Sequence, residues 1–113
     1  MSLSTHVLDT AGGQPAVGVD VTCERLDLAT GAWVEVARGT TDADGRIPTQ
    51  LSGGAMTAGP HRLTFDTGGW FAARGEQSFW HDVVVSFEVS DGGEHHHVPL
   101  LLSPYGYSTY RGT

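Results

Sequence analysis

The feature that most constrains the fold is a series of short runs in which apolar and polar residues alternate. Turn-forming residues separate these runs, and the chain of 113 residues holds 16 glycines and 5 prolines. Successive side chains of a strand point to opposite faces, so the alternation predicts strands with one buried face. We expect strands over residues 3–9, 17–28, 32–40, 46–49, 59–66, 82–89, 95–102 and 105–111. Short strands with frequent turns are typical of a β-sandwich.

The second of these runs changes face part of the way along. Its apolar alternation runs from Val17 to Cys23 and then continues out of phase at Leu26 and Leu28. One extra residue in a strand swaps its two faces, so a β-bulge is expected between these halves. Cys23 lies on the apolar side, where a small buried side chain is a better interpretation than a nucleophile. It is the only cysteine of the chain, which excludes an intrachain disulfide.

One segment departs from strand patterning. Residues 66–75 begin with Asp66, which is suited to cap a helix, and end with Gly75, which is suited to terminate one. This pattern predicts one or two helical turns. Eight strands and one short helix predict an all-β fold, a β-sandwich. A chain of this length fits a single domain, residues 1–113.

Charge and hydropathy restrict the partners of the chain. The formal net charge is −7, from 13 acidic and 6 basic residues. With so few cations, nucleic acid and anionic membrane surfaces are poor partners. No apolar run approaches the ~20 residues of a membrane-spanning helix. The N-terminus lacks the basic and apolar regions of a signal peptide, and the lone cysteine suits a reducing compartment, so a cytoplasmic location is expected.

Six histidines are the first candidates for chemistry. His95 and His97 share one strand face, and His96 points to the other. Histidine titrates near neutral pH and can hold or pass a proton. Two other interpretations stay open. The histidines 95–97 form a solvent-exposed start of a strand, or His95 and His97 bind a metal ion with His6 or His81 as a third ligand.

Arg46 is the second candidate. It directly follows the turn at residues 41–45, and its planar guanidinium is suited to hold a carboxylate or a polarised carbonyl. The alternative is a solvent-exposed side chain at the start of a strand. The sequence contains neither a Gly-x-Ser-x-Gly motif nor a glycine-rich phosphate loop, which argues against a serine hydrolase and a nucleotide-binding protein.

Several motifs together resemble the transthyretin-related 5-hydroxyisourate hydrolases. The first is Leu3-Ser4-Thr5-His6-Val7-Leu8-Asp9-Thr10, followed by Gly13-x-Pro15-Ala16, and the second is Thr41-Asp42-x-x-Gly45-Arg46. The third and most specific is the C-terminal segment from His95-x-His97-Val98-Pro99 to Tyr107-Ser108-Thr109-Tyr110-Arg111-Gly112. Residues 65–67 and 71–75 also look like the family. The resemblance covers nearly the whole chain, with one departure. The family typically ends in Tyr-Arg-Gly-Ser, whereas this chain ends in Thr113.

The resemblance implies a transthyretin-like β-sandwich that assembles as a homotetramer, a dimer of dimers, with active sites at the dimer–dimer interface. It implies hydrolysis of 5-hydroxyisourate to 2-oxo-4-hydroxy-4-carboxy-5-ureidoimidazoline in urate degradation, without a metal or other cofactor. His6, Arg46 and His97 match the catalytic positions. The tail that lines the site matches Tyr110, Arg111, Gly112 and Thr113.

The resemblance leaves the roles within this site partly open. His6 and His97 are the expected proton-handling pair, and the sequence does not rank them. His95 and His96 match no catalytic position of the family. Two alternative functions are a transthyretin-like carrier of a hydrophobic small molecule and a metal-dependent hydrolase that uses His95 and His97.

Overall fold

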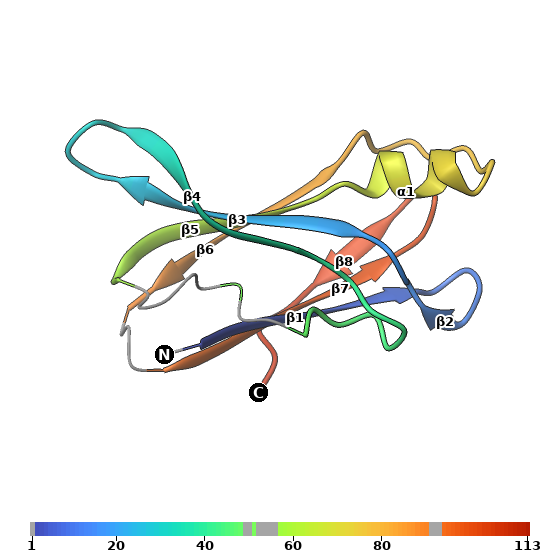
Figure 1. Cartoon of the computed structure of the whole chain (residues 1–113), viewed down its shortest axis with the longest axis horizontal. Coiled ribbons are helices and arrows are strands. Elements are labelled where there is room, and N and C mark those ends of the chain that lie inside the picture. The colour runs from blue at the N-terminus through green and yellow to red at the C-terminus, as the bar shows by residue number, and fades with distance from the viewer. Residues whose placement is uncertain (1, 49–50, 52–56, 91–93) are drawn as a thin grey trace.

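The computed structural model describes residues 2–48, 51, 57–90 and 94–113. In this part of the chain there are eight strands and one helix (Figure 1). The elements are β1 (Ser2–Asp9), β2 (Gln14–Pro15), β3 (Asp20–Asp27), β4 (Ala32–Thr40), β5 (Gly59–Phe65), α1 (Thr67–Ala73), β6 (Val83–Val89), β7 (His95–Leu102) and β8 (Tyr107–Thr109).

The strands form two four-stranded sheets, with the orders β2-β1-β7-β8 and β4-β3-β5-β6. Strands β1 and β7 are parallel, and the other paired strands are antiparallel. The sheets lie one above the other, with α1 at one end of the molecule (Figure 1). The predicted all-β sandwich is therefore confirmed.

The core fills the space between the sheets and follows the strand alternation. Each sheet supplies buried apolar side chains from alternate positions, including Leu3, Val7, Val98, Leu100 and Leu102 from one sheet and Val21, Cys23, Leu63, Phe65 and Val83 from the other. Burial, with a smaller contribution from the charge of Glu24, raises the pKa of the Cys23 thiol to about 12. The thiol therefore stays protonated at neutral pH, and the interpretation of Cys23 as a buried apolar residue is confirmed.

Strand β3 contains the predicted bulge, because its register against β4 shifts between Cys23 and Glu24. The prediction that Val17 and Leu28 belong to this strand and follow its alternation is wrong, because β3 spans only Asp20–Asp27. Val17 is 52% exposed and lies in a turn before the strand, and Leu28 is 75% exposed in the turn after it. The change of phase in the apolar alternation predicts the position of the bulge. The ends of the strand are instead set by backbone turns, such as the turn at Gly18, which has φ of +88°.

Three other strand predictions need correction. The predicted strand at 46–49 is reduced, within the described residues, to an isolated bridge between Arg46 and His6, while residue 49 lies outside them. The predicted strand at 105–111 is shortened to β8, because Ser103 and Gly106 first close a turn through reciprocal hydrogen bonds. The two-residue strand β2, which pairs with the end of β1, was not predicted.

Helix α1 confirms the predicted helical segment. Asp66 caps its start by accepting a hydrogen bond from the Gly69 amide, and the chain leaves it through Gly75 with φ of +71°. Trp70 and Phe71 are buried, and the Trp70 indole donates a hydrogen bond of 2.7 Å to the Val17 carbonyl. The helix thus covers one end of the sandwich (Figure 1).

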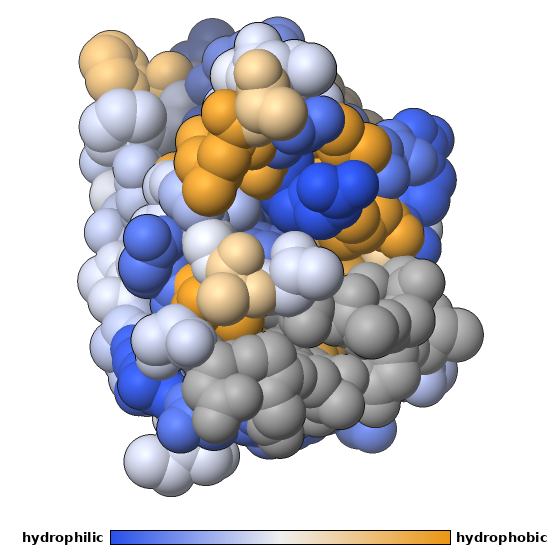
Figure 2. All heavy atoms as spheres, turned by 90° about the vertical axis from the view of Figure 1, so that its left-hand side faces the viewer, coloured by the Kyte–Doolittle hydropathy of each residue, from blue (hydrophilic) through white to orange (hydrophobic). Residues whose placement is uncertain are grey.

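The described surface at one end of the sandwich mixes polar and apolar residues (Figure 2). This end of the molecule lies at the left in Figure 1. None of the described helices is long and apolar enough to cross a membrane.

Candidate active site

The candidate site lies on the outer face of the β2-β1-β7-β8 sheet. Buried Leu3, Thr5 and Val7 of β1 face the core, so the intervening Ser4 and His6 point away from it. In β7 the same alternation turns His96 inward and His97 outward. The parallel pairing sets Ser4 opposite His97, so side chains far apart in sequence become neighbours on this face.

A tight turn carries Arg46 to the same strand. The Asp42 carboxylate accepts hydrogen bonds from the backbone amides of Asp44 and Arg46. Gly45 has φ of +76°, and a side chain there would collide with the Val7 carbonyl. The Val7 amide donates a 2.8 Å hydrogen bond to the Gly45 carbonyl. This turn is therefore fixed against β1, with Arg46 paired to His6.

The side chain of His6 also contacts this turn. Its Nε2 lies 2.9 Å from the backbone carbonyl of Asp44. A carbonyl can only accept, so His6 donates here and carries a proton on Nε2. When His6 is neutral, its lone pair is therefore on Nδ1.

The C-terminal tail approaches β7 from the side opposite to β1. Gly112 forms an isolated bridge with His97, and its amide donates a 2.8 Å hydrogen bond to the His97 carbonyl. A Cβ atom on Gly112 would overlap Cδ2 of His97 and lie 3.1 Å from its Cγ. The tail therefore packs directly against the imidazole, and a larger residue at this position must displace the ring or the tail.

The environment of His97 favours its neutral form. Its pKa is held below the ordinary value, with burial as the largest cause, followed by the positive charges of Arg46, His95 and His6. A hydrogen bond with the backbone of Ser4 acts in the opposite direction. The Ser4 hydroxyl also lies 2.7 Å from Nδ1 of this imidazole. A neutral imidazole at neutral pH can accept a proton.

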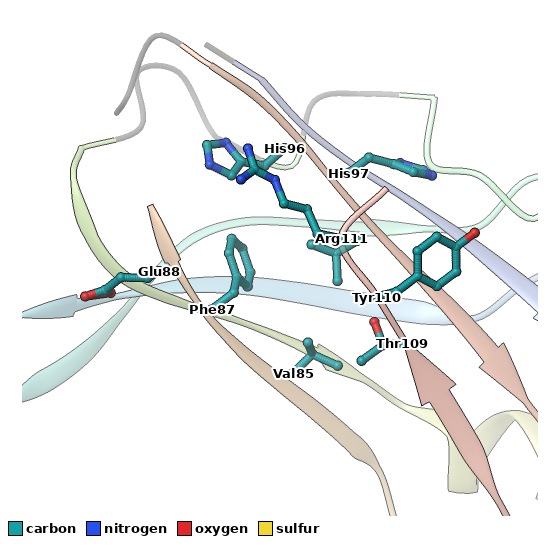
Figure 3. A pocket seen from close by; sticks show the side chains of 9 residues that line it. Val85, Phe87, Glu88, His96, His97, Thr109, Tyr110 and Arg111 are labelled. Carbon is teal, nitrogen blue, oxygen red and sulfur yellow. The ribbon is translucent and has the colours of Figure 1, made fainter. Parts of the chain in front are cut away.

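Two other tail residues border a pocket next to β7. Tyr110 and Arg111 line a pocket of about 230 Å³ together with Phe87, His96 and His97. In Figure 3 the Arg111 side chain extends toward His96, while the His97 ring points away from both. Arg111 donates a 3.1 Å hydrogen bond to Glu94. Thr113 is exposed.

The residues of the site predicted from the sequence fall into two groups, one linked by backbone pairing and one that borders the pocket. His6, Arg46, His97 and Gly112 are linked by backbone pairing across β1, the turn and the tail. Tyr110 and Arg111 border the pocket instead. Within the described residues, no three histidine, cysteine, aspartate or glutamate side chains are grouped closely enough to hold a metal ion.

Sequence reasoning gave no role to Ser4. Its hydroxyl oxygen lies 2.7 Å from Nδ1 of His97 and 3.0 Å from Nε2 of His95. The signal in the sequence was its spacing of two residues from His6, which puts both on one strand face. Alternation alone could not show which residues of β7 lie opposite.

Comparisons with known proteins match nearly the whole chain. Residues 3–112 match the model of the HIUase/Transthyretin family. The chain is 46% identical to the 5-hydroxyisourate hydrolase of Caulobacter vibrioides over 98% of this chain and 97% of that protein. The structure of the Klebsiella pneumoniae 5-hydroxyisourate hydrolase has a TM-score of 0.84 at 40% identity, with 100% of both chains covered. Sea bream transthyretin, solved in complex with thyroxine, has a TM-score of 0.92 at 32% identity, with 100% of this chain and 96% of that chain covered.

Proposed function

The chain belongs to the HIUase/Transthyretin family and is an enzyme of the hydroxyisourate hydrolase kind, and we propose that it hydrolyses 5-hydroxyisourate to 2-oxo-4-hydroxy-4-carboxy-5-ureidoimidazoline in urate degradation. The transthyretin-like sandwich predicted from the sequence is confirmed by the same comparisons. Fold alone does not separate a hydrolase from a carrier, because both occur on this sandwich. The proposal therefore depends on the residues of the site.

The observation that carries the proposal is the pairing of His6 with Arg46 and of His97 with Gly112 on adjoining strands. This pairing gathers two imidazoles and a guanidinium at one face of the sheet. Hydrolysis of a ring amide needs a base for water and a positive group for the oxyanion. These residue types meet both needs with side chains of the protein alone.

In the proposed mechanism His97 is the general base. Its lowered pKa keeps it neutral at neutral pH, and its Nδ1 is engaged by Ser4, which leaves Nε2 to meet the attacking water. The water loses a proton to Nε2 while its oxygen bonds to the ring carbonyl carbon. The C–N bond then breaks, and the leaving nitrogen takes up a proton, which opens the six-membered ring.

Arg46 and His6 have complementary roles in this mechanism. The guanidinium of Arg46 holds the substrate and stabilises the negative charge that develops on the carbonyl oxygen. It also offsets the repulsion between an anionic substrate and a chain of net charge −7. His6 uses Nε2 to contact Asp44, so its Nδ1 is the nitrogen left for hydrogen bonding to substrate or water. Tyr110, Arg111, Gly112 and Thr113 are proposed to complete the substrate site through the tail.

The direct test is hydrolysis of freshly prepared 5-hydroxyisourate, followed by the decay of its ultraviolet absorbance. We expect the purified protein to accelerate this decay, and the rate to be unchanged by a chelator. Decay at the same rate with and without protein would contradict the proposal. Loss of activity with the chelator and its return with zinc would favour the metal-dependent alternative that uses His95 and His97.

Gly112→Ala is expected to lower kcat/KM by about 10²-fold, because the new methyl group must displace the His97 ring or the tail. Thermal unfolding followed by circular dichroism is expected to be little changed, since Gly112 lies outside the named strands and the buried core. Gly106→Ala is the matched control, because its Cβ would meet its nearest neighbour, Ser103 Oγ, at an ordinary 3.6 Å. Equal activity of the two variants would show that the tail does not position His97.

The remaining expectations stay predictions. A homotetramer, built as a dimer of dimers, is checked by light scattering, and a cytoplasmic location by cell fractionation. The carrier alternative predicts tight binding of a hydrophobic ligand such as thyroxine without hydrolysis. Binding of that kind by a protein that leaves 5-hydroxyisourate untouched would favour it.

A further inference from the structure

The hydroxyl group of Ser4 lies between two imidazoles. Its oxygen is 2.7 Å from Nδ1 of His97 and 3.0 Å from Nε2 of His95, and both distances suit hydrogen bonds. The parallel register of β1 and β7 creates this contact by setting Ser4 opposite His97, while His95 lies two residues away on the same face. One hydroxyl therefore connects the proposed base with a second histidine that is exposed.

The number of hydrogens makes the two rings depend on one another. A serine hydroxyl has one hydrogen, so it can donate to only one of the two rings. The other ring must then donate its own N–H to the Ser4 oxygen. If His97 donates from Nδ1, its neutral Nε2 has the lone pair that a base needs. If His95 donates instead, neutral His97 carries its proton on Nε2 and cannot accept another there.

We propose that Ser4 is a positioning residue that holds His97 in the base-competent tautomer and passes a proton between His97 and His95. The proposal rests on the proposed function for its catalytic part. When Nε2 of His97 takes the proton of water, the Nδ1 proton moves to Ser4 Oγ and the Ser4 proton moves to Nε2 of His95. The reverse shift follows when His97 gives its Nε2 proton to the leaving nitrogen. No proton is gained or lost overall.

Charge explains why such a transfer is favourable. A positive charge on His97 would lie in a partly buried position near Arg46 and His6, which both act against it. His95 is exposed and follows Glu94, whose carboxylate contacts Arg111. Moving the charge to His95 brings it closer to solvent, where water stabilises it. His6 does not take part through Nε2, because that nitrogen donates to the Asp44 carbonyl.

Two substitutions separate positioning from proton transfer. Ser4→Ala removes the connecting hydroxyl, and we expect kcat to fall by at least about tenfold with KM changed less than about twofold. Ser4→Thr keeps a hydroxyl in a strand-compatible side chain and is expected to restore most of the rate. His95→Gln keeps a hydrogen-bonding amide but cannot hold the proton. It should therefore also lower kcat. Because His95 opposes a charge on His97 whenever His95 is itself protonated, its loss should also raise the pKa of His97 and shift the acid limb of the pH profile upward.

Ser86→Ala and His81→Gln are the matched controls, because both residues are exposed and lie outside the proposed site. Both are expected to behave as the unmodified protein. A normal rate and pH profile in Ser4→Ala and His95→Gln would overturn the proposal. A slow Ser4→Ala variant beside a normal His95→Gln variant would overturn the proton transfer.

A measurement without substrate keeps this proposal separate from the proposed function. In protein with ¹⁵N-labelled histidine, nuclear magnetic resonance is expected to show neutral His97 protonated on Nδ1, with the titrations of His95 and His97 coupled. Ser4→Ala should uncouple them. A His97 proton fixed on Nε2, or independent titrations in the unmodified protein, would overturn the coupling. Coupled titrations in a protein without hydrolase activity would instead contradict only the proposed function.

Discussion

Replacing His97 with alanine is expected to reduce kcat for 5-hydroxyisourate by about 10²- to 10⁴-fold, the usual contribution of a general base. The effect arises because water is a poor nucleophile at neutral pH and the variant has no group at this position to take its proton. Arg46 and the tail remain, so KM should change much less than kcat. Steady-state rates followed by ultraviolet absorbance measure both constants.

Two controls show whether the loss belongs to the imidazole itself. His81→Ala removes an exposed histidine outside the proposed site and should leave the rate unchanged. Circular dichroism of His97→Ala should show an unchanged β-sheet spectrum, since the side chain points away from the core. Full activity in His97→Ala would remove His97 from the mechanism and leave His6 as the base.

The pH profile of the unmodified enzyme gives a second view of His97. A base works in its neutral form, and the pKa of His97 is lowered by burial, by Arg46 and by His95 and His6 when these are protonated. The acid limb of kcat/KM should therefore lie below the ordinary histidine value of about 6.5, with the plateau already reached at neutral pH. An acid limb above that value would contradict this assignment.

Replacing Arg46 with alanine is expected to reduce kcat/KM by about 10²- to 10³-fold, which is typical for the loss of one group that stabilises an oxyanion. The turn that carries Arg46 is held by the Asp42 carboxylate, which accepts from two backbone amides, and by the Gly45 carbonyl, which accepts from the Val7 amide. The truncation should therefore leave the turn in place. Arg46→Lys keeps the charge but loses the planar fork and should recover only part of the rate.

The same substitution should also alter the titration of His97. Arg46 is one of the charges that lower the pKa of His97, so its removal should raise that pKa and shift the acid limb to higher pH. Arg38→Ala is the control, since Arg38 is an exposed arginine that pairs with Glu35 on β4. A large rate loss without any shift of the acid limb would place Arg46 at the substrate but away from His97.

Much of the fold could be predicted because strand alternation is a local signal. The strands around His95–Leu102 and Ala32–Thr40 were predicted with the observed bounds, and the bulge after Cys23 followed from a phase change. The predicted strand ends were wrong where a neighbouring turn determines where the strand begins or stops. Val17 continues the apolar alternation yet lies in a turn. Of the described residues in the predicted strand at 46–49, only Arg46 forms a β-bridge.

The site shows the same division. The residue types and their strand faces follow from sequence, since alternation places His6 on the outer face of β1 and His97 on that of β7. The family resemblance selected them from six histidines and six basic residues. No local pattern could show that Ser4 contacts two imidazoles, because that contact joins residues 93 positions apart in the case of His97.

The sequence by itself determined which side chains turn outward and which fill the core, because backbone geometry alternates them without reference to the rest of the chain. Only the tertiary structure decided which outward side chains meet. The parallel register of β1 with β7 sets Ser4 opposite His97. If β1 slipped by one residue along β7, its outward side chains would point to the opposite face of the sheet and these contacts would be lost. That register is fixed by the packing of both strands against the opposite sheet, which is a property of the whole sandwich.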